Sequence, residues 1–210
     1  YHRLRELLPY FRAEYTCSNC RFRQLMGDPF TQALHDYHFD EQHGPLRYRS
    51  GEQTKEADIG MYFQEFHLDE DGWLFSWLTG PLLDMGAGVG RHSLTLQERF
   101  ETVAIEHNAP LIETMRDRGV ADPRKANMFA LRDAFERNRF ASALAVGTQM
   151  SLARSMQGLR QFLGDLAYVT TPDGTAVVDG FDPSHEHTKE MLDYYDDPSD
   201  GLAYRVLQFE

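Results

Sequence analysis

Short apolar runs recur through the second half of the chain and are separated by segments with helical spacing. They are found at residues 82–83, 103–105, 140–146 and 175–179, and a weaker one lies near 124–126. Continuous apolar runs of this length are typical of strands that are buried on both faces of a parallel sheet. Their alternation with helical segments predicts an α/β fold.

Helices are predicted between these strands, over residues 93–100, 108–118 and 151–168. In the first helix, Leu96 and Phe100 are four residues apart and therefore share one face. In the second, Asn108 can act as the N-cap and Pro110 takes the second helical position, while Gly119 follows the end, where glycine is favoured. The pattern as a whole predicts a three-layer α/β sandwich with a mostly parallel sheet.

The first part of the chain and its end carry weaker patterns. Residues 2–14 have apolar side chains at helical spacing, with a break at Pro9. A short helix is predicted from Thr31 to Tyr37, with Thr31 as its cap. Residues 203–209 alternate between apolar and polar side chains, as a strand does.

The composition fits a soluble globular protein and limits its partners. Hydrophobic residues make up 41% of the 210 residues, no apolar run approaches the roughly 18 residues of a membrane span, and no signal peptide is visible. We therefore expect a cytoplasmic protein without a membrane partner. The net charge of −12 argues against nucleic acid as a partner, because binding to phosphates needs a basic face. A halophilic source is a second explanation for the acidity, and it would weaken the argument against nucleic acid.

The turn after the first strand is the most informative stretch, and it reads Asp84-Met85-Gly86-Ala87-Gly88-Val89-Gly90-Arg91. Its glycines fall at positions one, three and five, whereas the dinucleotide fingerprint has them at one, three and six. The sixth position is Arg91, whose bulk does not suit the close helix–sheet contact that the fingerprint glycine allows. One acid, Asp84, precedes the first glycine by two residues, and another, Glu106, closes the next strand.

This pattern of an acid, three alternate glycines and a second acid resembles motif I and the following acidic motif of the class I S-adenosylmethionine-dependent methyltransferases. The resemblance covers about residues 80–180. It implies a Rossmann-like sheet with S-adenosyl-L-methionine across the carboxyl ends of its strands. A carboxylate at Glu106 can accept hydrogen bonds from both hydroxyls of a ribose, and an acid at Asp84 is favourable near the ammonium of the methionine end.

The resemblance also implies contacts after the third and fourth strands. Where the family usually has an acid that accepts from the adenine amino group, this chain has Asn127, whose amide oxygen can also accept. Met128 is then expected to pack on the adenine, and Gly147-Thr148-Gln149-Met150 lies where the family's motif IV adjoins the transferable methyl. The cofactor-binding residues that the resemblance implies are Asp84, Gly86, Ala87, Gly88, Gly90, Arg91, Glu106, His107, Asn127, Met128, Val146 and Gly147.

The resemblance implies transfer of a methyl group by in-line displacement at the sulfonium, with the protein mainly positioning the two reactants. Enzymes that methylate amino groups of DNA bases carry an Asn/Asp-Pro-Pro-Tyr/Phe motif after the fourth strand, and this chain does not. A small-molecule acceptor is therefore favoured over nucleic acid. No catalytic residue is assigned, because a general base is needed only for an acceptor that is protonated at working pH. Neither the acceptor nor the oligomeric state follows from these patterns.

We expect residues 1–79 to form a helical and loop segment that covers cofactor and substrate, as the segment before the sheet does in the family. Residues 80–210 are expected to form the methyltransferase core. The candidates for the cover are Tyr37, Tyr48, Tyr62, Phe63 and His67. The family closes its sheet with an antiparallel pair of strands, of which only residues 203–209 are present, so we expect an incomplete C-terminal hairpin. The chain begins at Tyr1 without a methionine, as a fragment would.

The two cysteines form a Cys-x-x-Cys pair, Cys17 and Cys20. A zinc site would need two further ligands, and His35, His38 and His43 lie downstream, but their distance from Cys20 exceeds that of the usual finger. We therefore expect two ordinary thiols and no metal site, because half a motif is weak evidence for zinc.

Other functions stay open on these residues. The glycine-rich turn by itself also fits a tight strand–helix turn in an α/β protein of another function. An oxidoreductase using a nicotinamide or flavin is a second alternative, against which Arg91 and the missing sixth-position glycine argue. A protein that binds S-adenosylmethionine without catalysis is the third.

Overall fold

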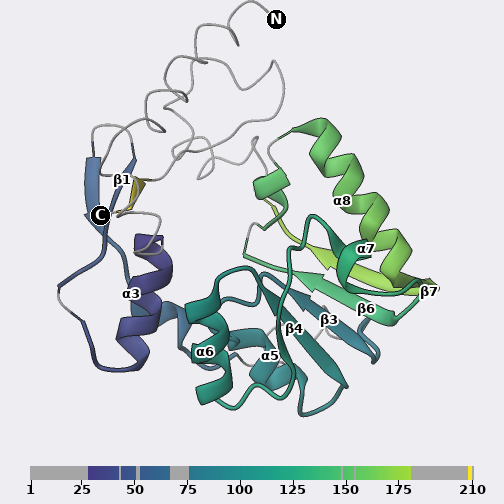
Figure 1. The fold of residues 1–210 in the computed structure, drawn as a ribbon, viewed down its shortest axis with the longest axis horizontal. Helices are drawn as coiled ribbons and strands as arrows, with labels where there is room; N and C mark the ends of the chain where they lie inside the picture. Colours follow the sequence, from purple (N-terminus) through teal and green to yellow (C-terminus); the bar gives the residue numbers. More distant parts are fainter. Residues whose placement is uncertain are drawn as a thin grey trace, which may run out of the picture.

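Five parallel strands form the central sheet of the molecule (Figure 1). This computed structural model describes residues 28–42, 44–50, 53–66, 76–147, 149–153, 155–180 and 208–209. In the order in which they pair across the sheet, the strands are β5 (Pro123–Lys125), β4 (Thr102–Glu106), β3 (Leu82–Met85), β6 (Phe140–Ala145) and β7 (Thr170–Val178). Every neighbouring pair is parallel, so the carboxyl ends of the strands lie along one edge of the sheet.

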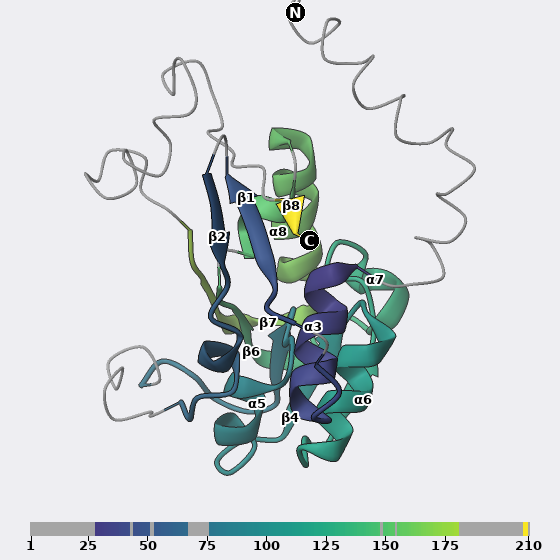
Figure 2. The same ribbon diagram turned by 90° about the vertical axis from the view of Figure 1, so that its left-hand side faces the viewer.

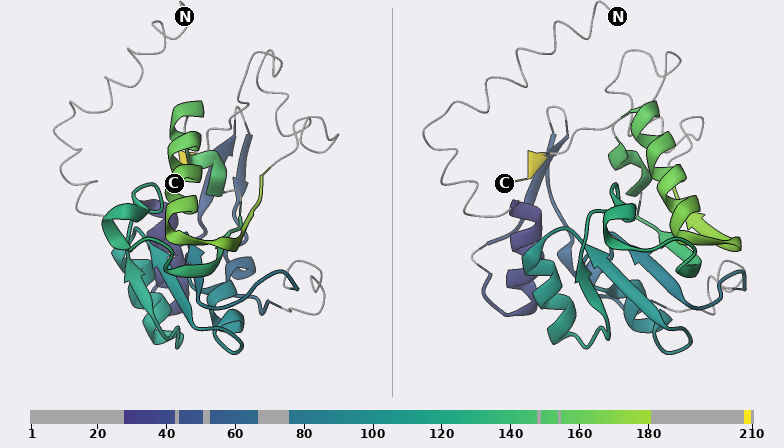
Figure 3. Two further views of the ribbon diagram at one scale, coloured as in Figure 1. Left: turned by 90° about the vertical axis from the view of Figure 1, so that its right-hand side faces the viewer. Right: turned by 45° about the vertical axis from the view of Figure 1, so that its right-hand side comes forward.

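The two faces of the sheet are covered by helices, as Figure 3 shows. Helices α7 (Leu131–Ala134) and α8 (Met156–Val169) lie on one face, and α5 (Arg91–Leu96) and α6 (Ala109–Asp117) lie on the other. Side chains of β3 alternate between them, because Leu83 packs with Phe162 of α8 while Leu82 packs with Leu96 of α5. The predicted three-layer sandwich with a parallel Rossmann-like sheet is thereby confirmed.

Some boundaries differ from the predicted ones. Strand β7 begins at Thr170, ahead of the predicted 175–179, and its register shifts between Phe140 and Ser142 of β6. Pro172 is tolerated there because β7 ends the strand order and a proline at an edge need not donate to a neighbour.

Helix α8 begins later than predicted, because the 3-10 helix η2 (Gln149–Ala153) precedes it. Ser155 is its N-cap, and the Ser155 Oγ accepts a hydrogen bond from the N–H of Gly158 at 3.0 Å. Helix α6 starts after Asn108 as predicted, but the Asn108 side chain makes no capping bond. Gly119 follows α6 with φ of +91°, as expected for the residue after a helix end.

A smaller unit, here called the cap, comprises α3 (Pro29–His38), β1 (Arg47–Ser50), β2 (Gln53–Glu56), the 3-10 helix η1 (Ile59–Tyr62) and β8 (Gln208–Phe209). Its antiparallel sheet has the order β2-β1-β8, and α3 lies side by side with α6 (Figure 2). Strand β8 thus pairs within the cap, not with the central sheet as predicted from 203–209. The reason is aromatic packing, since the Phe209 ring lies 5.0 Å from that of Phe30 and 6.3 Å from that of Tyr48.

The first helix of the cap begins earlier than predicted. Asp28, not Thr31, is its N-cap, and the Asp28 Oδ2 accepts from the N–H and the Oγ of Thr31 at 3.3 and 3.1 Å. Pro29 at the first helical position suits this start.

Several predictions lie outside the described residues, namely those on the helix of residues 2–14, on Cys17, Cys20 and His43, and on His67. Within the described part of the chain, each helix falls short of the length and apolarity that crossing a bilayer requires.

Candidate functional site

The turn between β3 and α5 brings three glycines to the carboxyl end of the central strand. Gly86, Gly88 and Gly90 have φ of +64°, +57° and +81°, in the left-handed region that favours glycine. The N–H of Ala87 donates to the carbonyl of Ile105 at 3.0 Å, which ties the turn to β4. The three glycines therefore set the shape of this turn, and the hydrogen bond to Ile105 sets its place beside the neighbouring strand.

Glu106 ends β4, and its buried carboxylate faces the glycine-rich turn. One oxygen, Oε1, accepts from the backbone N–H groups of His107 at 2.6 Å and Asn108 at 3.0 Å, and from the Asn108 Nδ2 at 3.4 Å. The other, Oε2, accepts from the N–H of Gly88 at 3.2 Å. The carboxylate thus joins the turn to the start of α6, and Oε2 keeps capacity for a further hydrogen bond.

A cavity of about 540 Å³ opens at this carboxylate, and its walls come from the carboxyl ends of the strands, from η2 and from α8. Five of the residues predicted to bind a cofactor line it, namely Gly86, Glu106, His107, Asn127 and Met128. The fold therefore brings residues from three different strand ends to one cavity. Ala87, Gly88 and Gly90 shape the turn beside it.

Asp84 lies beneath the turn and is not part of the cavity wall. Its side chain is buried, and its Oδ2 accepts from the Ser93 Oγ at 2.5 Å. Burial raises the pKa of the Asp84 carboxyl to about 7. The negative charge of the nearby Glu106 also raises this pKa, whereas the hydrogen bond from Ser93 lowers it. The Asp84 carboxyl was expected near the ammonium of a cofactor. In the structure it bonds Ser93 and so joins β3 to α5.

Three further predicted residues also lie outside the cavity wall. The Arg91 Nε donates to the carbonyl of Gln64 at 3.1 Å, so this side chain extends toward the segment before the sheet. The N–H of Gly147 donates to the Asp179 Oδ2 at 2.9 Å. Val146 packs at the border of the core cluster around Leu82.

Gln149, in the segment expected at motif IV but not among the predicted cofactor-binding residues, lines the cavity from η2. A Cβ placed on Gly86 would lie 2.7 Å from both Cδ and Oε1 of Gln149, so the Gln149 amide packs directly on the turn. The contact joins the end of β3 to the segment after β6, and no local pattern marks it. Phe129, Leu152 and Gln161 were missed for the same reason.

The residues expected to cover the site belong to the cap, and none of Tyr37, Tyr48, Tyr62 and Phe63 lines this cavity. They pack on other aromatic rings, with 4.8 Å between the ring centroids of Tyr37 and Phe63 and 5.2 Å between those of Phe30 and Tyr62. Burial raises the pKa of the Tyr62 hydroxyl.

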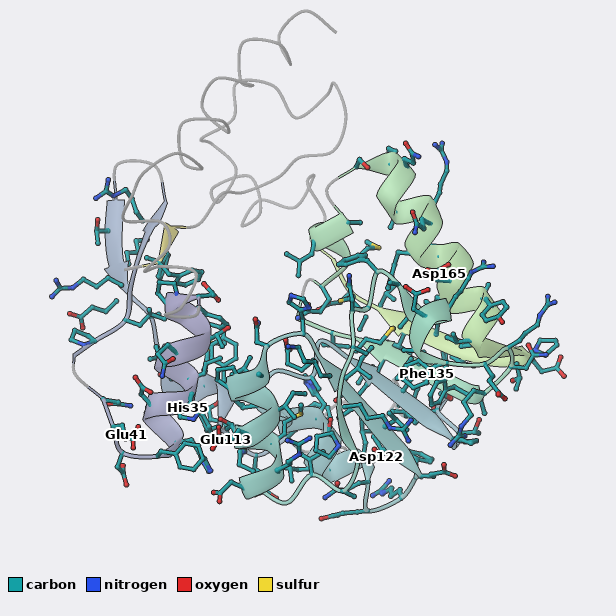
Figure 4. All side chains as sticks on the ribbon, viewed as in Figure 1. His35, Glu41, Glu113, Asp122, Phe135 and Asp165 are labelled. Carbon is teal, nitrogen blue, oxygen red and sulfur yellow. The ribbon has the colours of Figure 1, made fainter. Side chains whose placement is uncertain are left out.

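His35 and His38, considered above as metal ligands, face α6. The His35 Nε2 lies 3.7 Å from the Glu113 Oε2 (Figure 4), and the His38 Nε2 lies 2.7 Å from the Asp117 Oδ2. In the described part of the chain, ligand atoms within 4.8 Å of one another come from His35, Asp36 and Glu41. None of these side chains lines the cavity.

No protein-family model matches the chain, and no curated protein matches its sequence. Among solved structures, the chain is similar to an S-adenosylmethionine-dependent methyltransferase from Bacteroides fragilis in complex with S-adenosyl-L-homocysteine. The two are 28% identical with a TM-score of 0.59, over 70% of this chain and 62% of that one. The CcbJ methyltransferase from Streptomyces caelestis is 17% identical with a TM-score of 0.53, over 74% of this chain and 59% of that one.

A third similar structure is an S-adenosylmethionine-dependent methyltransferase from Thermotoga maritima, described as a possible histamine N-methyltransferase. It is 21% identical with a TM-score of 0.50, over 62% of this chain and 58% of that one. The chain thus spans less than two thirds of the length of each of these proteins. By its sheet, its glycine-rich turn and these likenesses, the chain has the Rossmann-like fold of the class I S-adenosylmethionine-dependent methyltransferases, the superfamily that its sequence resembles.

Proposed function

We propose that the protein is a methyltransferase that binds S-adenosyl-L-methionine and transfers its methyl group to a small-molecule acceptor. The observation that carries the proposal is the Glu106 carboxylate, which is buried at the cavity wall and held by the N–H groups of Gly88, His107 and Asn108. A carboxylate fixed in this way is suited to accept hydrogen bonds from a ribose diol. In support, the B. fragilis protein that the chain resembles was solved with S-adenosyl-L-homocysteine.

The opposite wall of the cavity suits an adenine ring. Met128 and Phe129 offer apolar surface for its faces, and Asn127 lies beside them. The Asn127 Oδ1 already accepts from the N–H of Phe129 at 2.9 Å. We therefore assign its Nδ2 as the donor to a ring nitrogen of adenine, in addition to the acceptor role that the sequence suggested.

The sulfonium of the cofactor supplies a methyl group that is already activated. The task left to the chain is to hold the acceptor in line with that group and to exclude water. We assign the methionine end of the cofactor to the part of the cavity that Gly86 and Gln149 line. Among the described residues we assign no general base.

A small molecule is the favoured acceptor for two reasons. The chain carries a net charge of −12, and the residues described at the cavity wall include neither lysine nor arginine. A protein that binds a phosphate backbone next to its reaction site needs such cations.

The test is a calorimetric titration of the protein with S-adenosylmethionine, S-adenosylhomocysteine and NAD, at low and at molar salt. We expect both adenosyl amino acids to bind and NAD not to bind. Preferential binding of NAD would overturn the proposal in favour of an oxidoreductase. Transfer of label from methyl-labelled S-adenosylmethionine is then measured against fractionated small molecules and against nucleic acid. Binding without transfer to any fraction would point to a non-catalytic binding protein.

A further inference from the structure

Arg118 connects the cap to the glycine-rich turn. It is the C-cap residue of α6, and its side chain is half-buried. Its Nη1 donates to the carbonyl of Val89 in the turn at 2.6 Å, while its guanidinium carbon lies 4.9 Å from the ring centroid of Phe63 in the cap. Burial lowers the pKa of Arg118, but a guanidinium stays charged at neutral pH, so both contacts are made by a cation.

The second half of the turn rests on this end of α6. A Cβ on Gly90 would lie 2.5 Å from the Val120 Cγ2 and 3.2 Å from the Met115 Cγ, so the backbone of the turn fits closely against both side chains. The Val89 side chain is buried in the cluster that joins the cap to α6, together with Leu34, Leu46, Ile59 and Leu111. Val89 is therefore held by the cap through its side chain and by Arg118 through its carbonyl.

The turn transmits this support to the ribose site. Gly88, one residue before Val89, donates its N–H to the Glu106 Oε2 at 3.2 Å. The Gly88 N–H lies two peptide planes before the Val89 carbonyl, so a shift of that carbonyl can reach it only through the φ and ψ angles of Val89 and Gly88. The geometry of the carboxylate that we assign to the ribose therefore depends on where Arg118 holds Val89.

Phe63, the residue of the cap that Arg118 contacts, packs in turn on side chains of α3. The Phe63 ring stacks on Tyr37 with 4.8 Å between centroids, and it lies parallel to the His38 ring at 6.1 Å. His38 in turn bonds Asp117, the residue before Arg118, at 2.7 Å. A displacement of α3 along α6 thus moves Phe63, on which the guanidinium of Arg118 is stacked.

We propose that Arg118 is a positioning residue that couples the cap to the cofactor-binding turn, so that the placement of the cap sets the affinity for the cofactor. The inference rests on the proposed function, because the turn is the one that would hold S-adenosylmethionine. One planar cation makes both contacts, so a change in the cap reaches Val89 through it. By linkage, binding of the cofactor must stabilise the attached cap by the same free energy.

The first test compares Arg118→Met with Arg116→Met, which makes the same charge change at an exposed position of the same helix. The ligand is S-adenosylhomocysteine, whose net charge is zero, so that a general loss of positive charge has little effect. We expect Arg118→Met to raise the Kd at least tenfold and Arg116→Met to leave it within twofold. Equal affinities of wild type and Arg118→Met would overturn the coupling while leaving the proposed function intact. A wild type that does not bind the ligand would refute the proposed function itself.

A double-mutant cycle with Phe63→Leu separates coupling from simple loss of stability, because Phe63 does not line the cavity. We expect Phe63→Leu to weaken binding at least threefold in the wild-type background and to have a clearly smaller effect beside Arg118→Met. Effects that multiply would show independent roles and overturn the proposal. Should Arg118→Met not fold, Arg118→Lys serves in its place, because lysine keeps the charge but cannot donate to Val89 and stack on Phe63 as one planar group.

Hydrogen exchange tests the reciprocal effect on the cap. In the wild type, we expect S-adenosylhomocysteine to slow amide exchange in α3 and η1, which do not line the cavity. In Arg118→Met at saturating ligand, this slowing should be clearly smaller, because only the packing of the Val89 side chain then joins the cap to the turn. Cap amides in the wild type that do not respond to the ligand would overturn the inference.

Discussion

Replacement of Glu106 by glutamine tests the site with the smallest change of shape. In the structure, Oε1 faces the N–H groups of His107 and Asn108, and Oε2 faces the N–H of Gly88. In Glu106→Gln, the amide oxygen stays at the N–H groups of His107 and Asn108, because both donate to it. The NH₂ group of the glutamine is therefore turned toward Gly88. That group is a donor, and it can accept neither the Gly88 N–H nor a ribose hydroxyl.

The expected loss follows from the bonds that change. A hydrogen bond to a charged group contributes about 1.5–3 kcal/mol. Since about 1.4 kcal/mol corresponds to a factor of ten, the Kd for S-adenosylhomocysteine should rise by about tenfold to about 150-fold in Glu106→Gln. The lower bound applies if water takes over part of the contact with the ribose.

The assay is calorimetry with S-adenosylhomocysteine and with its 2′-deoxy analogue, on the wild type, on Glu106→Gln and on Glu98→Gln. Glu98 is exposed just beyond the end of α5, so its replacement controls for the lost negative charge. The wild type and Glu98→Gln should lose affinity on removal of the 2′-hydroxyl, whereas Glu106→Gln should lose much less. An equal loss in all three proteins would refute the assignment of Glu106 to the ribose.

Two further predictions concern stability. Burial raises the pKa of Asp84 to about 7, above the value near 3.9 of an unfolded chain, so its contribution to the free energy of unfolding is full below about pH 4 and is lost as the pH rises through 7. The free energy of unfolding in urea should therefore fall for the wild type, relative to Asp84→Asn, by about 2–3 kcal/mol from pH 5 to pH 8. Parallel pH profiles of the two proteins would contradict this. In the turn, Gly88→Ala should destabilise by about 1–2 kcal/mol through its positive φ alone, because a Cβ there meets nothing within 4 Å. Gly90→Ala should destabilise by about 1–3 kcal/mol more, because its Cβ also meets Val120 at 2.5 Å, and equal unfolding midpoints for the two variants would rule this out.

The sequence alone determined the features that are local along the chain. Apolar runs specified β3, β4 and β6, and the glycines at 86, 88 and 90 specified a turn of positive φ between β3 and α5. The acid at the end of β4 was visible because a strand and its last residue are neighbours in sequence. These patterns predicted the fold and the resemblance to methyltransferases, because backbone conformation and periodicity are determined within a few residues.

The tertiary structure decided everything that joins the ends of different elements. It placed the Gln149 amide on Gly86, buried Asp84 beneath the turn and not at the cavity, and paired β8 with a strand of the cap. It also brought Arg118 between Val89 and Phe63. Such contacts depend on how helices and strands pack across tens of residues, and side chains that meet in this way share no pattern along the chain. That is why the sequence could predict a candidate site after β3, while the residues that line the cavity are seen only in the packing.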